Sequence, residues 1–280
     1  MTKQDVIEHY REYCHRHHLP FIQHTSLLSY DDTTLFCPAG MQQYKQLYEQ
    51  VDHRGTLTNS QSCLRLVDEN SIGDSTHYLF FDMLGFFSFR EWTVKQTVDF
   101  WLGFLSSLNL KPDYVTIHPD KPDWKDLYTD IEVRFDDECY WSDGGNLGGY
   151  CTEFYINDVE IGNIVNTGGH SIDVGFGCER ITNTLNPLTI KTSTSVLETT
   201  IDRLLQDGIL PSNKLHGYVL RKLMRKLWLL GGCCNHPSYQ QEVERQDKIV
   251  KLYERYKDRN RDKSPEWWFE TFGIDLTLLH

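Results

Sequence analysis

The sequence predicts an α+β fold, in which an antiparallel sheet flanked by helices is followed by a small helical domain. Two strand–turn–strand patterns and one helical segment support this prediction. Residues 63–67 and 77–84 are apolar runs on either side of a polar loop, which is typical of a β-hairpin. Residues 150–156 and 159–165 flank a two-residue turn of asparagine and aspartate. The last third of the chain instead shows helical periodicity.

The remaining elements follow from periodicity and from helix breakers. Apolar residues at helical spacing predict a first helix that ends before Pro20, and Pro38 and Gly40 separate a short strand from a second helix. The expected elements are helices at 3–18, 41–49 and 92–108 and strands at 33–36, 113–117 and 131–135.

The C-terminal third is expected to be a domain of its own. In residues 217–226, apolar and basic side chains fall on opposite faces of a helix, and residues 240–258 form a charged helix. We place the boundary after residue 191, which gives a first domain of residues 1–191 and a helical domain of residues 192–280.

Two arginines stand out as candidate anion ligands. Arg65 lies in an apolar strand, where an unpaired guanidinium would cost several kcal/mol. It must therefore meet either a carboxylate of its own chain or a ligand phosphate. Arg180 follows Gly175 and Gly177 in the first turn of an expected helix, where a cation opposes the helix dipole and so indicates anion binding. A structural salt bridge explains either arginine equally well.

Charge is unevenly distributed. The chain of 280 residues carries a formal net charge of −12, which argues against a nucleic-acid partner. Residues 214–263, however, hold 13 Lys and Arg against 6 Asp and Glu, a net +7 that leaves −19 elsewhere. A basic segment suits contact with a phosphate backbone. A solvated helical surface would have the same composition.

The cysteines and the hydropathy suggest a cytoplasmic protein. The eight cysteines are scattered without paired metal spacing, as is usual for free thiols in a reducing compartment. Cys233, Cys234 and His236 form the one local cluster, and adjacent cysteines rarely chelate one metal well. We see no signal peptide and no run of roughly 18 apolar residues, so no membrane association is expected.

At the two arginines the chain resembles the class II aminoacyl-tRNA synthetases, and the alanine-specific members in particular. The hairpin around Arg65, with Phe80-Phe81-Asp82-Met83-Leu84-Gly85 on its returning strand, is similar to their second signature motif. The segment from Asp173 to Arg180 is similar to the third motif. Further matches follow in the same order at residues 35–36, 39–45, 151–153, 160–165, 217–226 and 267–276.

This resemblance implies a class II synthetase-like fold that uses ATP and Mg²⁺. Arg65 would neutralise the α-phosphate and Arg180 the γ-phosphate, while Gly177 lies against the nucleotide. Phe81, or its neighbour Phe80, would stack on adenine. Glu153 would hold ATP and its magnesium ion.

The resemblance also implies two further binding regions. Trp141, Asn163, Val165 and Asp173 would surround the amino acid, with Asp173 receiving the α-ammonium group; a role in capping the following turn is the alternative. The acceptor stem of tRNA would be bound by Asn213, Arg221, Arg225 and Glu270, and Glu270 stands where the family has aspartate.

The implied activity is ATP-dependent formation of alanyl-adenylate and transfer of alanine to the 3′ end of tRNA(Ala). Gly162 stands in place of a family tryptophan, and residues 166–170 replace a longer apolar passage beside the pocket, which leaves glycine and serine open as substrates. The family's editing and C-terminal domains have no counterpart, so we expect a monomer. Two alternatives are a ligase that charges a carrier protein or small molecule, and a non-catalytic RNA-binding paralogue.

Overall fold

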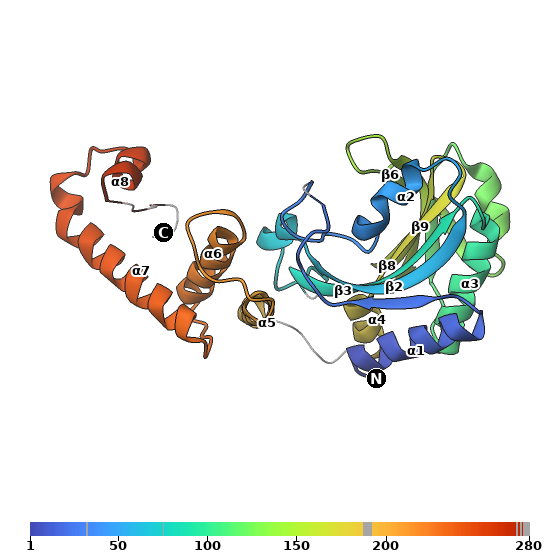
Figure 1. Ribbon diagram of the computed structural model, residues 1–280, viewed down its shortest axis with the longest axis horizontal. Helices are drawn as coiled ribbons and strands as arrows, with labels where there is room; N and C mark the ends of the chain where they lie inside the picture. The colour runs from blue at the N-terminus through green and yellow to red at the C-terminus, as the bar shows by residue number, and fades with distance from the viewer. Residues whose placement is uncertain (32, 75, 187–191, 273, 275, 277–280) are drawn as a thin grey trace. The chain divides into compact units, whose positions relative to one another are not determined.

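The chain forms two compact units. The computed structural model describes residues 1–31, 33–74, 76–186, 192–272, 274 and 276, with the backbone alone at 68, 70, 269, 270 and 272. One unit comprises Met1–Asn70 and Thr76–Ile190, and the other comprises Ser71–Ser75 and Lys191–His280. Figure 1 shows a sheet with its helices in the first unit and helices in the second. No helix in the described ranges is long and apolar enough to span a membrane.

The first unit is built on a mixed sheet whose path runs β1-β2-β3-β9-β8-β7-β4-β5, with β6 paired to β7. Neighbouring strands are antiparallel except for two parallel pairs at the ends of the path, β1 with β2 and β4 with β5. The strands of the described chain are β1 Phe21–His24, β2 Gly55–Leu64, β3 Phe80–Phe89, β4 Tyr114–Ile117, β5 Glu132–Phe135, β6 Tyr140–Ser142, β7 Gly148–Ile156, β8 Val159–Thr167 and β9 Ser171–Gly177.

Helices cover both faces of this sheet (Figure 1). One face packs against α1 Lys3–Arg16, α3 Val94–Ser107 and α4 Cys178–Leu185, and the other packs against α2 Lys45–Glu49. Threonine capping boxes start α1 at Thr2 and α3 at Thr93. Short 3₁₀ helices lie at Gln42–Tyr44, Leu66–Asn70 and Pro122–Leu127.

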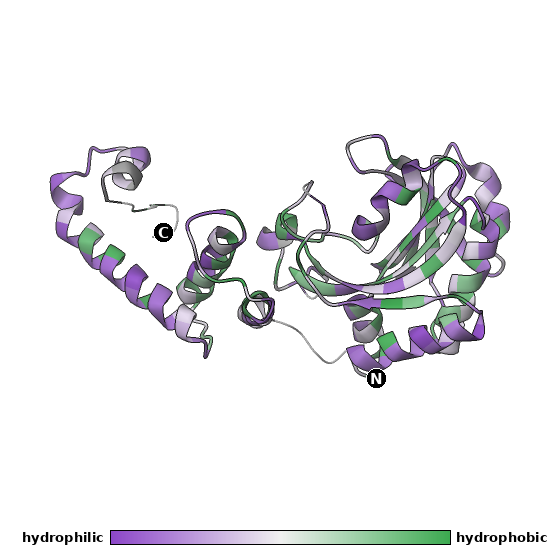
Figure 2. Cartoon of the chain, in the orientation of Figure 1, coloured by the Kyte–Doolittle hydropathy of each residue, from purple (hydrophilic) through white to green (hydrophobic). Residues whose placement is uncertain are grey.

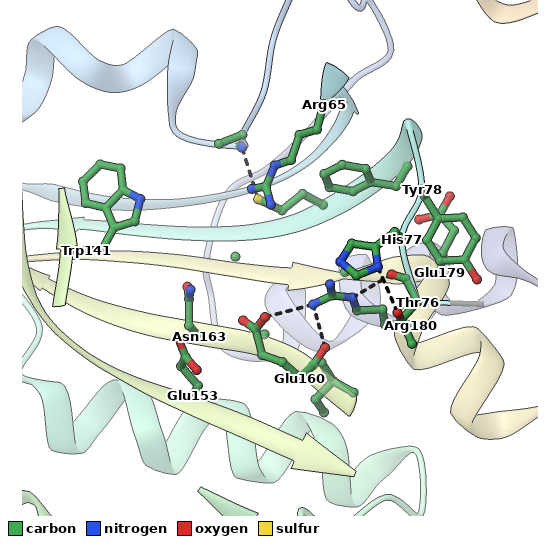
Figure 3. Close-up of a pocket in the computed structure, with 18 of the residues that line it drawn as sticks. Arg65, Thr76, His77, Tyr78, Trp141, Glu153, Glu160, Asn163, Glu179 and Arg180 are labelled. Atoms are coloured by element: carbon green, nitrogen blue, oxygen red, sulfur yellow. Dashed lines mark hydrogen bonds and ion pairs between the residues drawn. The ribbon is translucent and has the colours of Figure 1, made fainter. Parts of the chain in front are cut away.

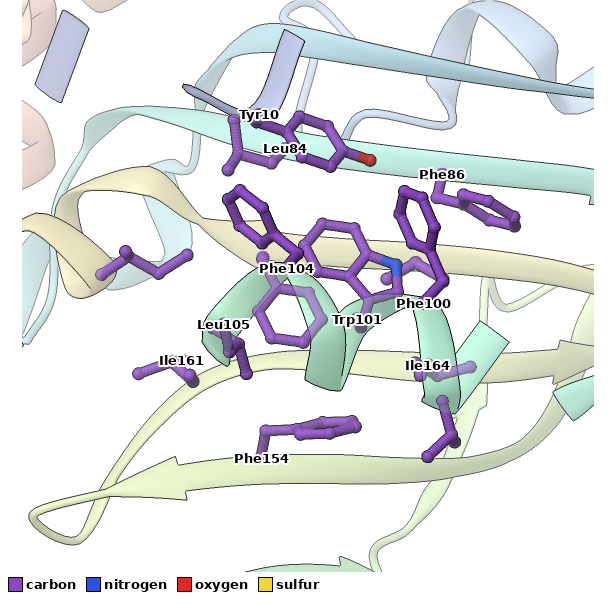
Figure 4. Close-up of a cluster of buried hydrophobic side chains, with 14 of the residues drawn as sticks. Tyr10, Leu84, Phe86, Phe100, Trp101, Phe104, Leu105, Phe154, Ile161 and Ile164 are labelled. Atoms are coloured by element: carbon purple, nitrogen blue, oxygen red, sulfur yellow. The ribbon is translucent and has the colours of Figure 1, made fainter. Parts of the chain in front are cut away.

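The main core lies between the sheet and α1 and α3. Trp101 of α3 is fully buried at its centre and stacks on Phe176 of β9, with ring centroids 4.1 Å apart. Figure 4 shows aromatic side chains from α1, α3 and the sheet around this indole. Along β3, Phe86 points into this core and Phe87 packs on the α2 side, which explains why β3 is almost continuously apolar.

The predicted hairpins were found, with corrected boundaries in the first of them. The second hairpin is confirmed as β7 and β8, and its turn residues Asn157 and Asp158 have φ of +53° and +59°, as a type I′ turn requires. In the first hairpin, the predicted strand over 63–67 was wrong beyond Leu64, because β2 runs from Gly55 to Leu64 and a 3₁₀ helix follows. The returning strand begins at Phe80 rather than at residue 77.

The strand predicted at 33–36 was also wrong. In the described part of this segment the only β pairing is an isolated bridge between Leu28 and Phe36. The edge strand was missed at Phe21–His24, where it follows Pro20 and pairs in parallel with β2. A four-residue strand with two exposed side chains gives no clear alternation in the sequence.

The second unit is helical throughout its described residues. Its helices are α5 Ser193–Gln206, α6 Leu215–Leu229, α7 Pro237–Tyr256 and α8 Pro265–Phe272, with a 3₁₀ turn at Lys257–Arg259. Figure 2 shows α7 as predominantly hydrophilic, as the sequence predicted. The predicted separation of apolar and basic residues on α6 fails at Arg221, which is 8% exposed among leucines.

Candidate active site

A cavity of about 410 Å³ opens in the first unit over β3, β8 and β9. The segment Ala39–Met41, the end of β2 and the start of α4 complete its wall. Nearly all residues that the sequence assigned to ATP and the amino acid line this one cavity, although they come from segments more than 100 residues apart. Figure 3 shows Arg65 and Arg180 reaching toward it from different elements.

Arg65 follows the last residue of β2 and has no carboxylate partner among the described residues. Its Nε donates to the Pro38 carbonyl oxygen at 2.9 Å, and its guanidinium lies 5.1 Å from the centre of the Phe81 ring. Phe81 lines the cavity, whereas the neighbouring Phe80 ring lies under the Lys3 ammonium. The sequence left two possible partners for this half-buried arginine, a carboxylate of its own chain or a ligand phosphate. The geometry therefore favours an external anion.

Arg180 is already paired within its own chain. It is the third residue of α4, in the first turn as predicted, and its Nη1 donates to the carboxylate of Glu160 at 2.9 Å and to the Glu160 carbonyl at 2.8 Å. Its Nε donates to the Thr76 carbonyl at 3.3 Å. A phosphate at this position would have to compete with Glu160. Gly177 precedes the helix, and the nearest atoms to a Cβ there would be Arg180 carbons at 3.5–3.6 Å.

Asp173 presents an isolated carboxylate to the cavity. It lies within β9, opposite Phe87 of β3 and Val165 of β8. Burial raises the pKa of its carboxyl group to about 7, and in the described structure its side chain has neither a hydrogen-bond donor nor a cation. The alternative that Asp173 caps the following turn therefore gains no support. A cationic ligand would relieve the cost of its desolvation.

Glu153, on β7, lies beside Asn163 of β8 in the sheet register, and both line the cavity (Figure 3). Its carboxylate accepts a hydrogen bond from the Tyr155 hydroxyl at 2.7 Å. Burial raises the pKa of Glu153, and the nearby Glu160 and Asp136 carboxylates raise it further. Because Mg²⁺ is usually held by one or two carboxylates together with phosphates and water, this acidic position fits a nucleotide-bound magnesium ion.

Two apolar side chains, Val165 and Trp141, line one part of the cavity. Val165 is 1% exposed and packs with Trp141, which also lines the cavity. The loop after Trp141 is held by Asp143, whose carboxylate accepts from the Gly145 and Leu147 amides and pairs with Lys45 at 2.6 Å.

Phe176 on the neighbouring strand β9 explains why residue 162 is a glycine. A Cβ at Gly162 would lie 2.3 Å from the Phe176 ring and 2.7 Å from the Gly175 carbonyl oxygen. The Phe176 ring, stacked on Trp101, therefore occupies the space that a side chain at 162 would need. The glycine at this position therefore accompanies a large residue on the adjacent strand.

The second unit brings together two of the predicted tRNA-binding residues. Arg221 forms an ion pair with Glu242 at 3.0 Å and donates to the Asn213 side-chain oxygen. Both Asn213 and Arg221 line a cavity of about 710 Å³. Arg225 does not line this cavity, and its Nε is buried without a hydrogen-bond partner among the described residues. The side chain of Glu270 lies outside the described residues.

One group of potential metal ligands was missed from the sequence. Cys139, Cys151 and Glu153 converge, with their ligand atoms all within 4.8 Å of one another. They come from two paired segments, so only the strand register reveals them. The local cluster in the sequence does not converge in this way. The Cys234 thiol donates to Asp202 at 3.1 Å, and His236 caps α7.

The sheet, the two arginines and the acidic cavity define a class II tRNA synthetase domain. The family model described as "tRNA synthetases class II (A)" matches residues 3–195, and the chain therefore belongs to this family.

Two curated relatives agree with this assignment. The chain is 26% identical to the alanine--tRNA ligase of Lawsonia intracellularis, over 82% of this chain and 36% of that protein. It is 28% identical to the alanine--tRNA ligase of Endomicrobium trichonymphae, over 70% of this chain and 31% of that protein. It thus spans about a third of the length of these relatives. A pyrrolysyl-tRNA synthetase structure from Desulfitobacterium hafniense matches with a TM-score of 0.43 and 12% identity, over 64% of this chain and 67% of that one.

Proposed function

We propose that the chain activates a small amino acid, by preference alanine, with ATP and transfers it to the 3′ end of tRNA(Ala). The observation that carries the first half of this proposal is the charge pattern of the cavity. It contains Arg65 without a carboxylate partner and Asp173 without a cationic partner among the described residues. A site with an unpaired cation and an unpaired anion suits a phosphate and an ammonium group bound side by side, with the carboxylate of the same amino acid placed to attack the phosphate.

In the first step, the amino-acid carboxylate attacks the α-phosphorus of ATP, giving an aminoacyl-adenylate and releasing pyrophosphate. The protein contributes position and charge. Asp173 would hold the α-ammonium group, and Arg65 would neutralise the α-phosphate as charge develops. Phe81 would stack on adenine beneath Arg65.

Three further residues would hold the triphosphate. Arg180 would receive the γ-phosphate in exchange for Glu160, with Gly177 leaving room beside it. Mg²⁺, when bound to ATP at Glu153, would supply charge neutralisation of the phosphates. Glu153 fits this role because its carboxylate borders the cavity beside other acidic groups.

Alanine is favoured because both curated relatives described above are named alanine--tRNA ligases. Val165 and Trp141 supply apolar side chains to the cavity wall, and Asn163 lines the same cavity. One methyl or hydroxyl group is worth only about 1–3 kcal/mol of discrimination in such a pocket. We therefore expect measurable activation of glycine and serine.

The helical unit supports tRNA as the acceptor. We propose that residues 1–191 form the catalytic domain and residues 192–280 the acceptor-stem-binding domain, with Asn213, Arg221, Arg225 and Glu270 as candidate contacts. The basic segment 214–263 would supply the phosphate contacts. We also propose a monomer, which light scattering tests.

The experiment is amino-acid-dependent ATP–pyrophosphate exchange across alanine, glycine and serine, followed by charging of a tRNA(Ala) acceptor minihelix. Arg65→Ala should reduce exchange by about 10²–10³-fold, the usual effect of losing one group that stabilises transition-state charge. Arg11→Ala is the matched control, because Arg11 is exposed and pairs only with Glu8 of its own helix among the described residues.

The outcomes separate the candidate functions. Exchange with alanine and charging of the minihelix would establish the proposal. Exchange without charging would indicate a carrier protein or small-molecule acceptor. No exchange with any amino acid would leave a non-catalytic RNA-binding protein.

A further inference from the structure

The group of two cysteines and one glutamate has the composition and spacing of a metal site. Cys139 directly precedes β6, and Cys151 lies on β7, where its backbone amide donates to the Cys139 carbonyl at 2.9 Å. Glu153 follows Cys151 by two residues, so both side chains point to the same face of β7. The three ligand atoms lie within 4.8 Å of one another.

These positions require little movement to surround one ion. Tetrahedral Zn²⁺, with ligands at about 2.0–2.3 Å, would place neighbouring ligand atoms roughly 3.4–3.8 Å apart. The two thiols are already confined, since Cys139 is 0% and Cys151 2% exposed, and both pack against Val165 and Trp141. A buried, preformed pair of sulfur ligands loses little conformational entropy on binding.

The two thiolates and one carboxylate determine which metal ion this group would prefer. Thiolates favour zinc and other thiophilic metals, whereas Mg²⁺ and Ca²⁺ favour oxygen ligands. The surroundings also favour a cation, because Glu153 has no cationic partner in the described structure and lies near the carboxylates of Asp136 and Glu160. Coordination would release the two thiol protons to solvent.

From this geometry we propose that Cys139, Cys151 and Glu153 bind one Zn²⁺ ion at the wall of the 410 Å³ cavity. Three protein ligands leave a fourth position open, the pattern of zinc sites that take water or a ligand. Of the three ligands, Glu153 lines the cavity, whereas the two cysteines lie behind it and pack against Trp141 and Val165 of its wall. The Glu153 carboxylate would then be shared with the nucleotide-bound Mg²⁺ proposed above, so zinc binding is tested without ATP, amino acid or tRNA.

The first test is calorimetric titration of Zn²⁺ alone into the full chain, after removal of metals by a chelator under reducing conditions. The expected result is one ion per chain with proton release. Co²⁺ in place of zinc should give a thiolate-to-cobalt charge-transfer band and the visible spectrum of a tetrahedral site. Failure of the reduced chain to bind zinc would overturn the proposal, whatever the variants do.

The second test identifies which residues bind the ion. Cys139→Ser and Cys151→Ser should each weaken zinc binding by more than the roughly 10–100-fold typical of losing an outer-shell partner. Glu153→Gln should weaken binding while retaining the charge-transfer band. Cys233→Ser is the matched control, because Cys233 is exposed and belongs to the cysteine cluster evident in the sequence. It should bind zinc as the unaltered chain does.

Two results would assign the ligands differently. Loss of the ion in Cys233→Ser, with full binding in folded Cys139→Ser, would place the metal in the helical unit and overturn the proposal. A Cys139–Cys151 crosslinked peptide that persists through purification under mild reduction would show a disulfide instead of an ion site. Circular dichroism of each variant separates ligand loss from unfolding.

Discussion

Asp173 is a buried carboxyl group whose protonation links the stability of the fold to pH. Its pKa is about 7 in the folded protein against the usual 3.8, so the folded state binds this proton more tightly than the unfolded state does. Its contribution to the free energy of unfolding is therefore present below about pH 4 and is lost as pH rises to about 7.

We expect Asp173→Asn to stabilise the protein above pH 7 while abolishing amino-acid activation. The three-unit pKa shift corresponds to at most about 4 kcal/mol in the free energy of unfolding. Urea unfolding at several pH values measures this change, and the gain should disappear near pH 4. In the unaltered chain, kcat/KM for the amino acid should rise with pH and level off above about 7. Efficient exchange by Asp173→Asn would rule out its ammonium-binding role.

Gly162 tests whether the core face of the sheet, where Phe176 stacks on Trp101, depends on a size exchange between neighbouring strands. A methyl group at 162 would overlap the Phe176 ring and the Gly175 carbonyl. Gly162→Ala should therefore lower the free energy of unfolding by about 1–3 kcal/mol, the usual cost of overpacking. Phe176→Leu in the same chain should recover part of this loss, whereas additive losses in a double-mutant cycle would contradict the exchange.

At the scale of elements, Lys3 connects the first helix to the ends of β3 and α4. Its ammonium pairs with Glu179 at 3.0 Å and with Asp82, whose side chains are 6% and 11% exposed. Burial alone would lower the pKa of Lys3, but the two carboxylates raise it above its usual value. The Glu179 carboxylate also accepts from the Asp82 amide at 2.9 Å. This network fixes the start of the helix that carries Arg180.

Lys3→Met should cost about 3 kcal/mol of unfolding free energy, because it leaves two buried carboxylates without a cation. Lys95→Met is the control, since Lys95 pairs with Asp99 on an exposed helix surface and should cost less than about 1 kcal/mol. Denaturant unfolding of both variants decides the comparison. Equal small effects would mean that solvent or another cation replaces Lys3.

The elements that could be predicted from the sequence were those in which apolar and polar residues alternate regularly. The β7–β8 hairpin and α3 were recognisable because their periodicity is regular. Most of β2 was not, because its buried residues 58–62 are Thr, Asn, Ser, Gln and Ser. Their side chains are satisfied in part by distant carbonyls, as when Asn59 donates to Gly40 and Thr58 to Pro20. Such partners cannot be inferred from local sequence.

At the scale of the whole molecule, motifs far apart in the sequence form one cavity, and their residue types largely indicated it. What the sequence could not reveal was which arginine has an internal partner, because Glu160 reaches Arg180 only through the pairing of β8 with β9. The convergence of Cys139 with Cys151 depends likewise on the register of β6 and β7.

The division into two units predicts that activation and transfer can be separated by mutation. Asn213 belongs to the helical unit, where Arg221 donates to its side-chain oxygen and is itself held by Glu242. Arg221 is therefore better suited to position Asn213 than to contact RNA directly. If Asn213 contacts a base pair, losing that contact should cost about 1–3 kcal/mol.

We therefore expect Asn213→Ala to reduce minihelix charging by about 10–100-fold, with ATP–pyrophosphate exchange close to that of the unaltered chain. Asn235→Ala is the control, because Asn235 is an exposed asparagine of the same unit. Arg221→Met should reproduce the charging defect, since the orientation of Asn213 depends on the Arg221 guanidinium. Equal losses of exchange and charging would show that the two steps share these residues, and normal charging by Asn213→Ala would place acceptor recognition elsewhere in the helical unit.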